Sequence, residues 1–261
     1  MDLDYSTPGM LKVSMIKYLK KIFVSFPEKI TSSAATPAAD HLFEIRDESV
    51  RKLLPEEQAR MFHHTVAQLL FLSGRARPDI KTAVAFLTTR CKAPDEDDWG
   101  KLKRCLKYLW GTKHMKLVLT VDNLHTLRWW VDASYAVHGD MRSHTGACMS
   151  MGRGVFNVKS SKQKLNTKSS TESELIGASD YLPWVIWMKH FLKLSKLFHP
   201  FNLAIYRFLD SRSYRHGIHV TSECGVVPNE IYCAKRDSDC PMVMEIRDTG
   251  CRHLNCPYPR R

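Results

Sequence analysis

Apolar residues recur at helical spacing through three segments of the first 115 residues. The first segment carries Val66, Leu69 and Leu70. The second starts at Pro78, a residue well suited to a first helical turn, and its apolar side chains share one face: Ile80, Ala83, Val84 and Leu87. The third opens with the acidic residues 95–98, ends in basic residues before Gly111, and has the stripe Trp99, Leu102, Leu106 and Leu109. Acids at the start and bases at the end complement a helix dipole, so we predict three helices.

From residue 116 the apolar pattern becomes that of strands. Residues 117–121 and 127–131 are short apolar runs, and residues 143–151 and 155–161 flank Gly152-Arg-Gly154, which predicts a β-hairpin. Helical spacing returns after residue 169. There Trp184, Trp187 and Phe191 form a row that we expect in the core, with stacking on nucleic-acid bases as the alternative. Pro183 is expected to kink or break the helix.

Charge and cysteine usage restrict the class of protein. The 261 residues carry a net charge of +12, which favours an anionic partner such as nucleic acid. No apolar run reaches the roughly 18 residues that span a bilayer, and residues 1–5 lack the form of a signal peptide. We therefore expect an intracellular protein, cytoplasmic or nuclear, with reduced thiols and no membrane partner.

Residue usage changes near residue 198. Of 21 lysines, 20 precede residue 199, whereas the last 63 residues hold one lysine, eight arginines and five cysteines. We predict a mostly helical segment over 1–115, an incomplete α/β domain over 116–198, and a divergent, poorly ordered tail over 199–261. Residues 31–40, rich in Ser, Thr, Ala and Pro, are predicted to form an exposed linker.

Two carboxylates on separate elements are the candidate chemistry. Asp132 closes an apolar strand, where an unpaired acid is costly, and Glu174 follows in the first turns of a helix. If Ser169 is the N-cap, Glu172 completes a capping box and Glu174 is left to reach the strand end. Two divalent ions held by carboxylates can activate water and stabilise a leaving oxygen at a phosphodiester. The alternative is that Glu172 and Glu174 are solvated acids at a helix start.

Several ordered motifs resemble one family. Trp130-Val-Asp-Ala-Ser134, Arg142-Ser-His-Thr-Gly146, Ser160-Ser-Lys-Gln-Lys164 and Ser169-Ser-Thr-Glu-Ser-Glu-Leu175 are similar to the ribonuclease H domain of copia-type retrotransposon polyproteins. Upstream, residues 62–74, 77–80 and 103–112 resemble the region that connects the reverse transcriptase to that domain. The resemblance covers roughly residues 10–195. The paired polymerase aspartates of the family have no counterpart here, so DNA synthesis by this chain alone is not expected.

The resemblance implies a fold, a reaction and a set of ligands. The fold is α/β: a ribonuclease H-like mixed five-stranded sheet with flanking helices. The reaction is Mg²⁺-dependent hydrolysis of RNA in RNA–DNA hybrids, with Mn²⁺ as the alternative ion and no small-molecule cofactor. Asp132 and Glu174 match the first catalytic Asp and the catalytic Glu. Asp210 is the candidate third ligand, although its spacing and flanks fit poorly, and an ordinary loop acid is the alternative.

Basic residues near these acids are candidates for contacts with an RNA–DNA hybrid or another nucleic acid. They are Arg142, Lys162, Lys164 and Lys168. Such lysines supply sequence-independent affinity for phosphates, but a solvated loop explains them equally well. The main alternative for the whole chain is a truncated, non-catalytic remnant that binds nucleic acid. A zinc site at Cys251-Arg-His-Leu-Asn-Cys256 is a further hypothesis, without the paired two-residue spacing of structural zinc sites.

Overall fold

The computed structural model describes residues 1–122, 126–195, 202–207 and 243–246. The architecture is mixed α/β, with two sheets and two separate hydrophobic clusters. The helices are α1 (Ile16–Ser25), α2 (Glu56–Ser73), the short 3-10 helix η1 (Pro78–Ile80), α3 (Lys81–Arg90), α4 (Glu96–Gly111) and α5 (Ser170–Leu194). The strands are β1 (Asp2–Asp4), β2 (Met10–Ser14), β3 (Leu117–Thr120), β4 (Thr126–Ser134), β5 (His144–Ser150), β6 (Asn157–Lys162), β7 (Asn202–Arg207) and β8 (Val243–Ile246).

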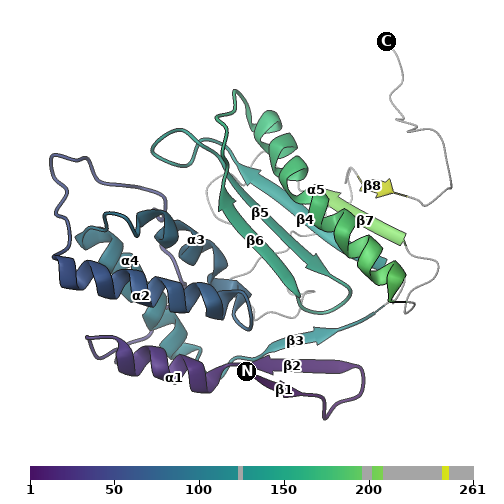
Figure 1. The fold of residues 1–261 in the computed structure, drawn as a ribbon, viewed down its shortest axis with the longest axis horizontal. Helices are drawn as coiled ribbons and strands as arrows, with labels where there is room; N and C mark the ends of the chain where they lie inside the picture. Colours follow the sequence, from purple (N-terminus) through teal and green to yellow (C-terminus); the bar gives the residue numbers. More distant parts are fainter. Residues whose placement is uncertain (123–125, 196–201, 208–242, 247–261) are drawn as a thin grey trace.

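Helices α1 to α4 gather on one side of the molecule and enclose the larger hydrophobic cluster (Figure 1). The three helices predicted from apolar spacing are α2, η1 continuing into α3, and α4. Helix α4 begins with a complete capping box, because the Asp98 N–H donates to Asp95 Oδ1 at 2.9 Å and the Asp95 N–H donates to Asp98 Oδ2 at 3.1 Å. Leu70, expected on the apolar face of α2, is instead 42% exposed.

A buried ionic network joins η1 to the end of α4. Arg77 Nη2 lies 2.6 Å from Asp79 Oδ2, and the Tyr108 hydroxyl donates to the same oxygen at 2.8 Å. Arg77 also donates to the Thr112 carbonyl at 3.0 Å. Burial by itself would lower the pKa of Arg77, but the Asp79 carboxylate raises it above its ordinary value. The guanidinium therefore stays charged inside the helical cluster.

The first sheet has the order β1-β2-β3, with both pairs antiparallel. Strand β3 lies beyond the predicted domain boundary at residue 116, yet it pairs with β2 of the N-terminal segment. The β5–β6 turn docks on β3, where the Thr120 N–H donates to the Arg153 carbonyl at 2.9 Å. Gly154, at φ +80°, leaves no room for a side chain, because an added Cβ would lie 2.0 Å from the Val118 carbonyl oxygen. This contact connects the two sheets.

The second sheet is mixed, in the order β6-β5-β4-β7-β8. Strands β4, β5 and β6 are antiparallel neighbours, as the predicted hairpin requires, and β7 runs parallel to β4. Strands β7 and β8 come from the predicted tail, so part of 199–261 belongs to this sheet. Helix α5 lies across the sheet (Figure 1). Together they bury the second cluster: Leu127, Trp129, Val131, Ala147, Met149, Tyr181 and Val185.

Helix α5 has no break at Pro183, and the expected burial of the aromatic row is wrong. The helix is continuous from Ser170 to Leu194, with Pro183 inside it rather than at a break. The sheet packing that holds α5 on both sides of Pro183 offsets the one backbone hydrogen bond that proline removes. The exposed fractions of Trp184, Trp187 and Phe191 are 43%, 54% and 53%, so these aromatic residues lie outside the core, while Tyr181 and Val185 face the sheet.

Within the described part of the chain, none of the helices is long and apolar enough to cross a membrane.

Candidate functional site

Asp132 lies near the end of β4, the central strand of the second sheet. Its side chain is half-buried, and its Oδ1 accepts a hydrogen bond from the Ala133 N–H at 2.8 Å. Burial alternates along β4, so Val131 and Ala133 face α5 while Asp132 points to the other face of the sheet. Its partner on β5 is Gly146, so this position of β5 places no side chain beside the carboxylate.

The start of α5 is fixed by the expected cap. The Glu172 N–H donates to Ser169 Oγ at 3.2 Å, and Glu172 Oε2 accepts from the Lys168 N–H at 2.6 Å. The prediction that Glu172 serves the cap is therefore confirmed, with Lys168 rather than Ser169 as its backbone donor. Glu174, two residues further on, is 8% exposed. Glu172 therefore forms part of the helix cap, whereas Glu174 is buried.

Gly177 sets how closely α5 approaches the sheet. A Cβ added at Gly177 would lie 2.9 Å from Thr145 Cγ2 and 3.6 Å from Ala133 Cβ. Glu174 precedes this contact by one helical turn, and Asp132 precedes Ala133 by one residue. The backbone positions of the two acids therefore lie close to the point where α5 crosses β4 and β5. A glycine inside a predicted helix is the signal that could have located this contact from sequence.

Gln163 fixes the same crossing from the loop after β6. Its Nε2 donates to Thr145 Oγ1 at 2.8 Å and to the Ser173 carbonyl at 2.7 Å. The side chain is 2% exposed and connects β5 to the first turn of α5. Sequence reasoning placed Gln163 only within a basic stretch, because its neighbours are lysines. Its burial gives it a positioning role that the lysines do not share.

The four predicted basic residues divide into two pairs. Lys162 Nζ and Arg142 Nε lie 2.6 Å and 3.5 Å from Asp140 Oδ2. Burial alone would raise the pKa of Asp140, but the hydrogen bond from Lys162 holds it below its ordinary value. Lys164 and Lys168 are exposed on the loop between β6 and α5. Only these two are free of an ion pair to a described carboxylate, and they remain the better candidates for phosphate contacts.

A buried histidine pair occupies the face of the sheet opposite α5. His138 Nε2 lies 3.1 Å from His144 Nδ1, and His144 Nε2 lies 2.7 Å from Ser160 Oγ. Phe43 packs against both imidazole rings, with centroids 5.0 Å apart in each case. Burial lowers the pKa of His138 to about 4 and that of His144 to about 3. Both rings are therefore neutral near pH 7 and join the helical segment to the sheet.

The donor chemistry at Asp132 and Glu174 fits Mg²⁺, which prefers oxygen ligands and is often held by one or two carboxylates plus substrate phosphates. No group of three or more His, Cys, Asp or Glu side chains among the described residues is arranged to hold a metal ion. The predicted third ligand, Asp210, and the cysteines of the zinc hypothesis lie outside the described residues.

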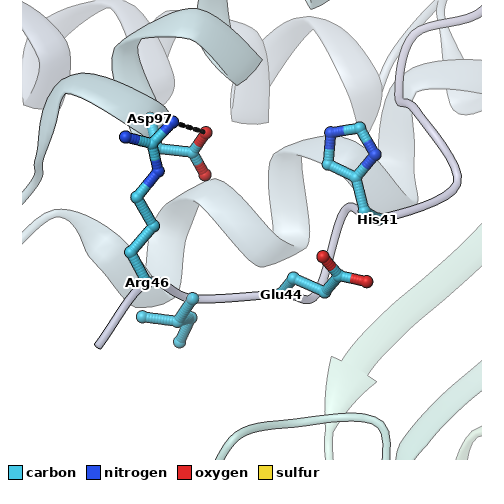
Figure 2. Close-up of a pocket in the computed structure, with 5 residues that line it drawn as sticks. His41, Glu44, Arg46 and Asp97 are labelled. Carbon is cyan, nitrogen blue, oxygen red and sulfur yellow. Dashed lines mark ion pairs between the residues drawn. The ribbon is translucent and has the colours of Figure 1, made fainter. Parts of the chain in front are cut away.

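A cavity of about 300 Å³ opens elsewhere, between the loop after residue 40 and the start of α4. It is lined by His41, Glu44, Ile45, Arg46 and Asp97, and Arg46 Nη2 lies 3.6 Å from Asp97 Oδ1 (Figure 2). Neither Asp132 nor Glu174 contributes to it. The cavity is therefore separate from the candidate carboxylate site.

Known proteins similar to this chain include transposon proteins from plants and yeast. Over 195 residues it is 30% identical to the retrovirus-related Pol polyprotein from transposon TNT 1-94 of Nicotiana tabacum, a match covering 72% of this chain and 14% of that polyprotein. It is 26% identical over 184 residues to a putative transposon Ty5-1 protein of Saccharomyces cerevisiae, covering 69% and 58% of the two chains. It is also 31% identical over 126 residues to the secreted RxLR effector protein 161 of Plasmopara viticola, covering 47% and 87%.

No family model and no solved structure matches the chain. The chain spans 14% of the length of the tobacco polyprotein and 58% of that of the yeast protein. The tobacco match covers 72% of this chain at 30% identity, and a putative yeast transposon protein matches 69% of it. On these grounds the chain belongs to the Pol polyproteins of copia-type retrotransposons.

Proposed function

We propose that the second sheet and α5 form a ribonuclease H-like unit that hydrolyses RNA in RNA–DNA hybrids with Mg²⁺. The observation that carries the proposal is the close contact of Gly177 with Ala133 and Thr145, which puts the opening turns of α5 at the end of β4. An acid stands beside that contact on each element, Asp132 on the strand and Glu174 on the helix. The mixed, five-stranded sheet supports the same assignment.

Asp132 and Glu174 would hold the ion, which supplies charge stabilisation at the phosphodiester and an activated water. Gln163 would position Glu174, because it ties the first turn of α5 to β5 through Ser173 and Thr145. Lys164 and Lys168, exposed on the loop that leads into α5, would hold the phosphate backbone of the hybrid. Glu172 would keep the helix start intact without touching the substrate.

The second candidate function is binding without catalysis, by a remnant of a reverse transcriptase. It is favoured by the lack of a three-ligand group among the described residues. The alternation of side chains along β4 also favours it, because it directs Asp132 away from the face that carries α5. In that case the net charge of +12 supplies affinity for nucleic acid, and neither carboxylate takes part in hydrolysis of a phosphodiester.

Cleavage of a labelled RNA–DNA hybrid by the purified chain separates the two functions. We expect Mg²⁺-dependent cutting that is abolished by EDTA and by Asp132→Asn or Glu174→Gln. Glu172→Gln is the matched control, because glutamine preserves the cap and removes one negative charge from the same helical turn. Binding of the hybrid with no cutting would establish the non-catalytic function. Cutting that persists in Asp132→Asn would show that Asp132 is not a ligand of the catalytic ion.

A further inference from the structure

The outward side of α5 carries a row of exposed aromatic side chains. Trp184, Trp187 and Phe191 follow one another at helical spacing, each between 43% and 54% exposed. Trp184 and Trp187 pack edge to face, with centroids 6.2 Å apart, and Phe191 stacks on Trp187 at 5.4 Å with an interplanar angle of 13°. The core contacts of α5 are made by other residues, such as Tyr181 and Val185. The row is therefore not needed to attach the helix to the sheet.

A lysine from another element, Lys159, lies against this row, and a second, Lys81, lies near Lys159. Lys159 of β6 lies on the face of the sheet that carries α5, and its Nζ is 4.4 Å from the centroid of the Trp184 ring. Lys81, at the start of α3, is close enough to Lys159 that burial and then the charge of Lys159 lower its pKa. Among the described residues, neither lysine has a carboxylate within ion-pair distance. Two adjacent cations without a counter-ion favour an anionic ligand.

The charges along α5 point to the same kind of ligand. From Pro183 to Leu194 the helix has no acidic residue and two lysines, Lys189 and Lys193. Asp180, one turn before Trp184, is the nearest acid on the exposed side of the helix. An apolar protein partner would be expected to meet a neutral surface, whereas aromatic rings beside a lysine such as Lys159 suit bases and phosphates. Cation–π contact with Lys159 also orients the Trp184 ring.

We propose that Lys81, Lys159, Trp184, Trp187 and Phe191 form a binding surface for single-stranded nucleic acid. The aromatic rings stack on unpaired bases, and the two lysines hold the phosphates that run beside them. A duplex keeps its bases stacked on each other, so it cannot use the rings in this way. The surface is distinct from Asp132 and Glu174, and it does not depend on either carboxylate being catalytic.

Fluorescence anisotropy of a labelled oligothymidine of about 15 nucleotides, titrated with the full chain, tests this surface. Trp187→Ala is expected to weaken binding about tenfold through loss of base stacking. Lys159→Gln is expected to weaken binding and to reduce the slope of log affinity against log salt by about 0.7. Asp180→Asn is expected to strengthen binding, because it removes an exposed acid one helical turn before Trp184.

The matched control is Lys113→Gln, because Lys113 Nζ also lies over a tryptophan ring, 4.1 Å from the centroid of Trp110, but on the helical side of the molecule. It should bind the oligonucleotide as the wild type does. Circular dichroism of each variant establishes that it is folded. Equal affinities in the wild type, Trp187→Ala and Lys159→Gln would overturn the proposal. So would concentration-dependent self-association that Trp187→Ala abolishes while oligonucleotide affinity stays unchanged.

Discussion

Replacing Asp79 with alanine is predicted to destabilise the helical cluster more than any surface change in the chain. Asp79 is 7% exposed and accepts hydrogen bonds from Arg77 and from the Tyr108 hydroxyl. Its loss leaves the guanidinium of Arg77, itself 4% exposed, with the carbonyl and hydroxyl oxygens of Thr112 as remaining acceptors. Breaking one partner of a buried ion pair costs about 3–5 kcal/mol, mostly because the other charge stays buried.

Two further substitutions measure the contribution of one hydrogen bond to this carboxylate and that of an exposed ion pair. Tyr108→Phe removes one hydrogen bond to the carboxylate and should reduce the free energy of unfolding by about 1.5–3 kcal/mol. Glu56→Gln breaks the exposed Arg60–Glu56 pair, whose side chains are 77% and 91% exposed, and should change it by less than about 0.5 kcal/mol. The contrast between the buried and exposed pairs tests burial, rather than charge, as the source of the effect.

Urea unfolding followed by far-ultraviolet circular dichroism and by tryptophan fluorescence measures these differences. Two probes are needed because the chain has two hydrophobic clusters, which need not unfold together. The reasoning would be refuted if Asp79→Ala cost less than about 1 kcal/mol with an unchanged dependence on urea. That result would mean that water reaches Arg77 despite its burial.

Three further substitutions test particular contacts. Gly154→Ala should lower the free energy of unfolding by at least about 2 kcal/mol in urea, because it combines a positive φ with a clash at Val118; Gly100→Ala, which meets nothing within 4 Å in α4, should instead raise it by about 0.5–1 kcal/mol. The pKa values of His138 and His144 are lowered to about 4 and about 3, so the unfolded chain binds more protons below pH 6.5. Their contribution is complete above that pH and is lost as the pH falls towards 4, by at most about 1.4 kcal/mol per unit for each ring. His144→Asn should flatten the dependence of unfolding on pH between 6.5 and 4, and an unchanged slope would contradict the burial argument.

Local signals predicted the helices and the hairpin well, because the interactions that form them lie within a few residues. The cap at Ser169 and Glu172 and the capping box at Asp95 depend only on nearby backbone groups. The absence of a break at Pro183 has the converse reason. Its local penalty is real, but contacts with a sheet more than twenty residues away along the chain hold the helix on either side of it.

Contacts between distant segments could not be predicted from the apolar pattern. Strand β3 has the same pattern whichever sheet it joins, and its pairing with β2 depends on residues a hundred positions earlier. The aromatic row of α5 was predicted to be buried because spacing identifies a face without showing which face meets the sheet. The candidate acids were identified from the order of the motifs, whereas the role of Gln163 became visible only through its contacts.

A crystal of the protein grown with Mn²⁺ would test most directly whether the two acids hold a common ion. Asp132 and Glu174 come from neighbouring points on β4 and α5, but the alternation of the strand directs Asp132 towards the other face of the sheet. We expect an anomalous scattering peak with an oxygen of each carboxylate within about 2.5 Å. A peak bound by one carboxylate alone, with the other on the opposite face of the sheet, would contradict it.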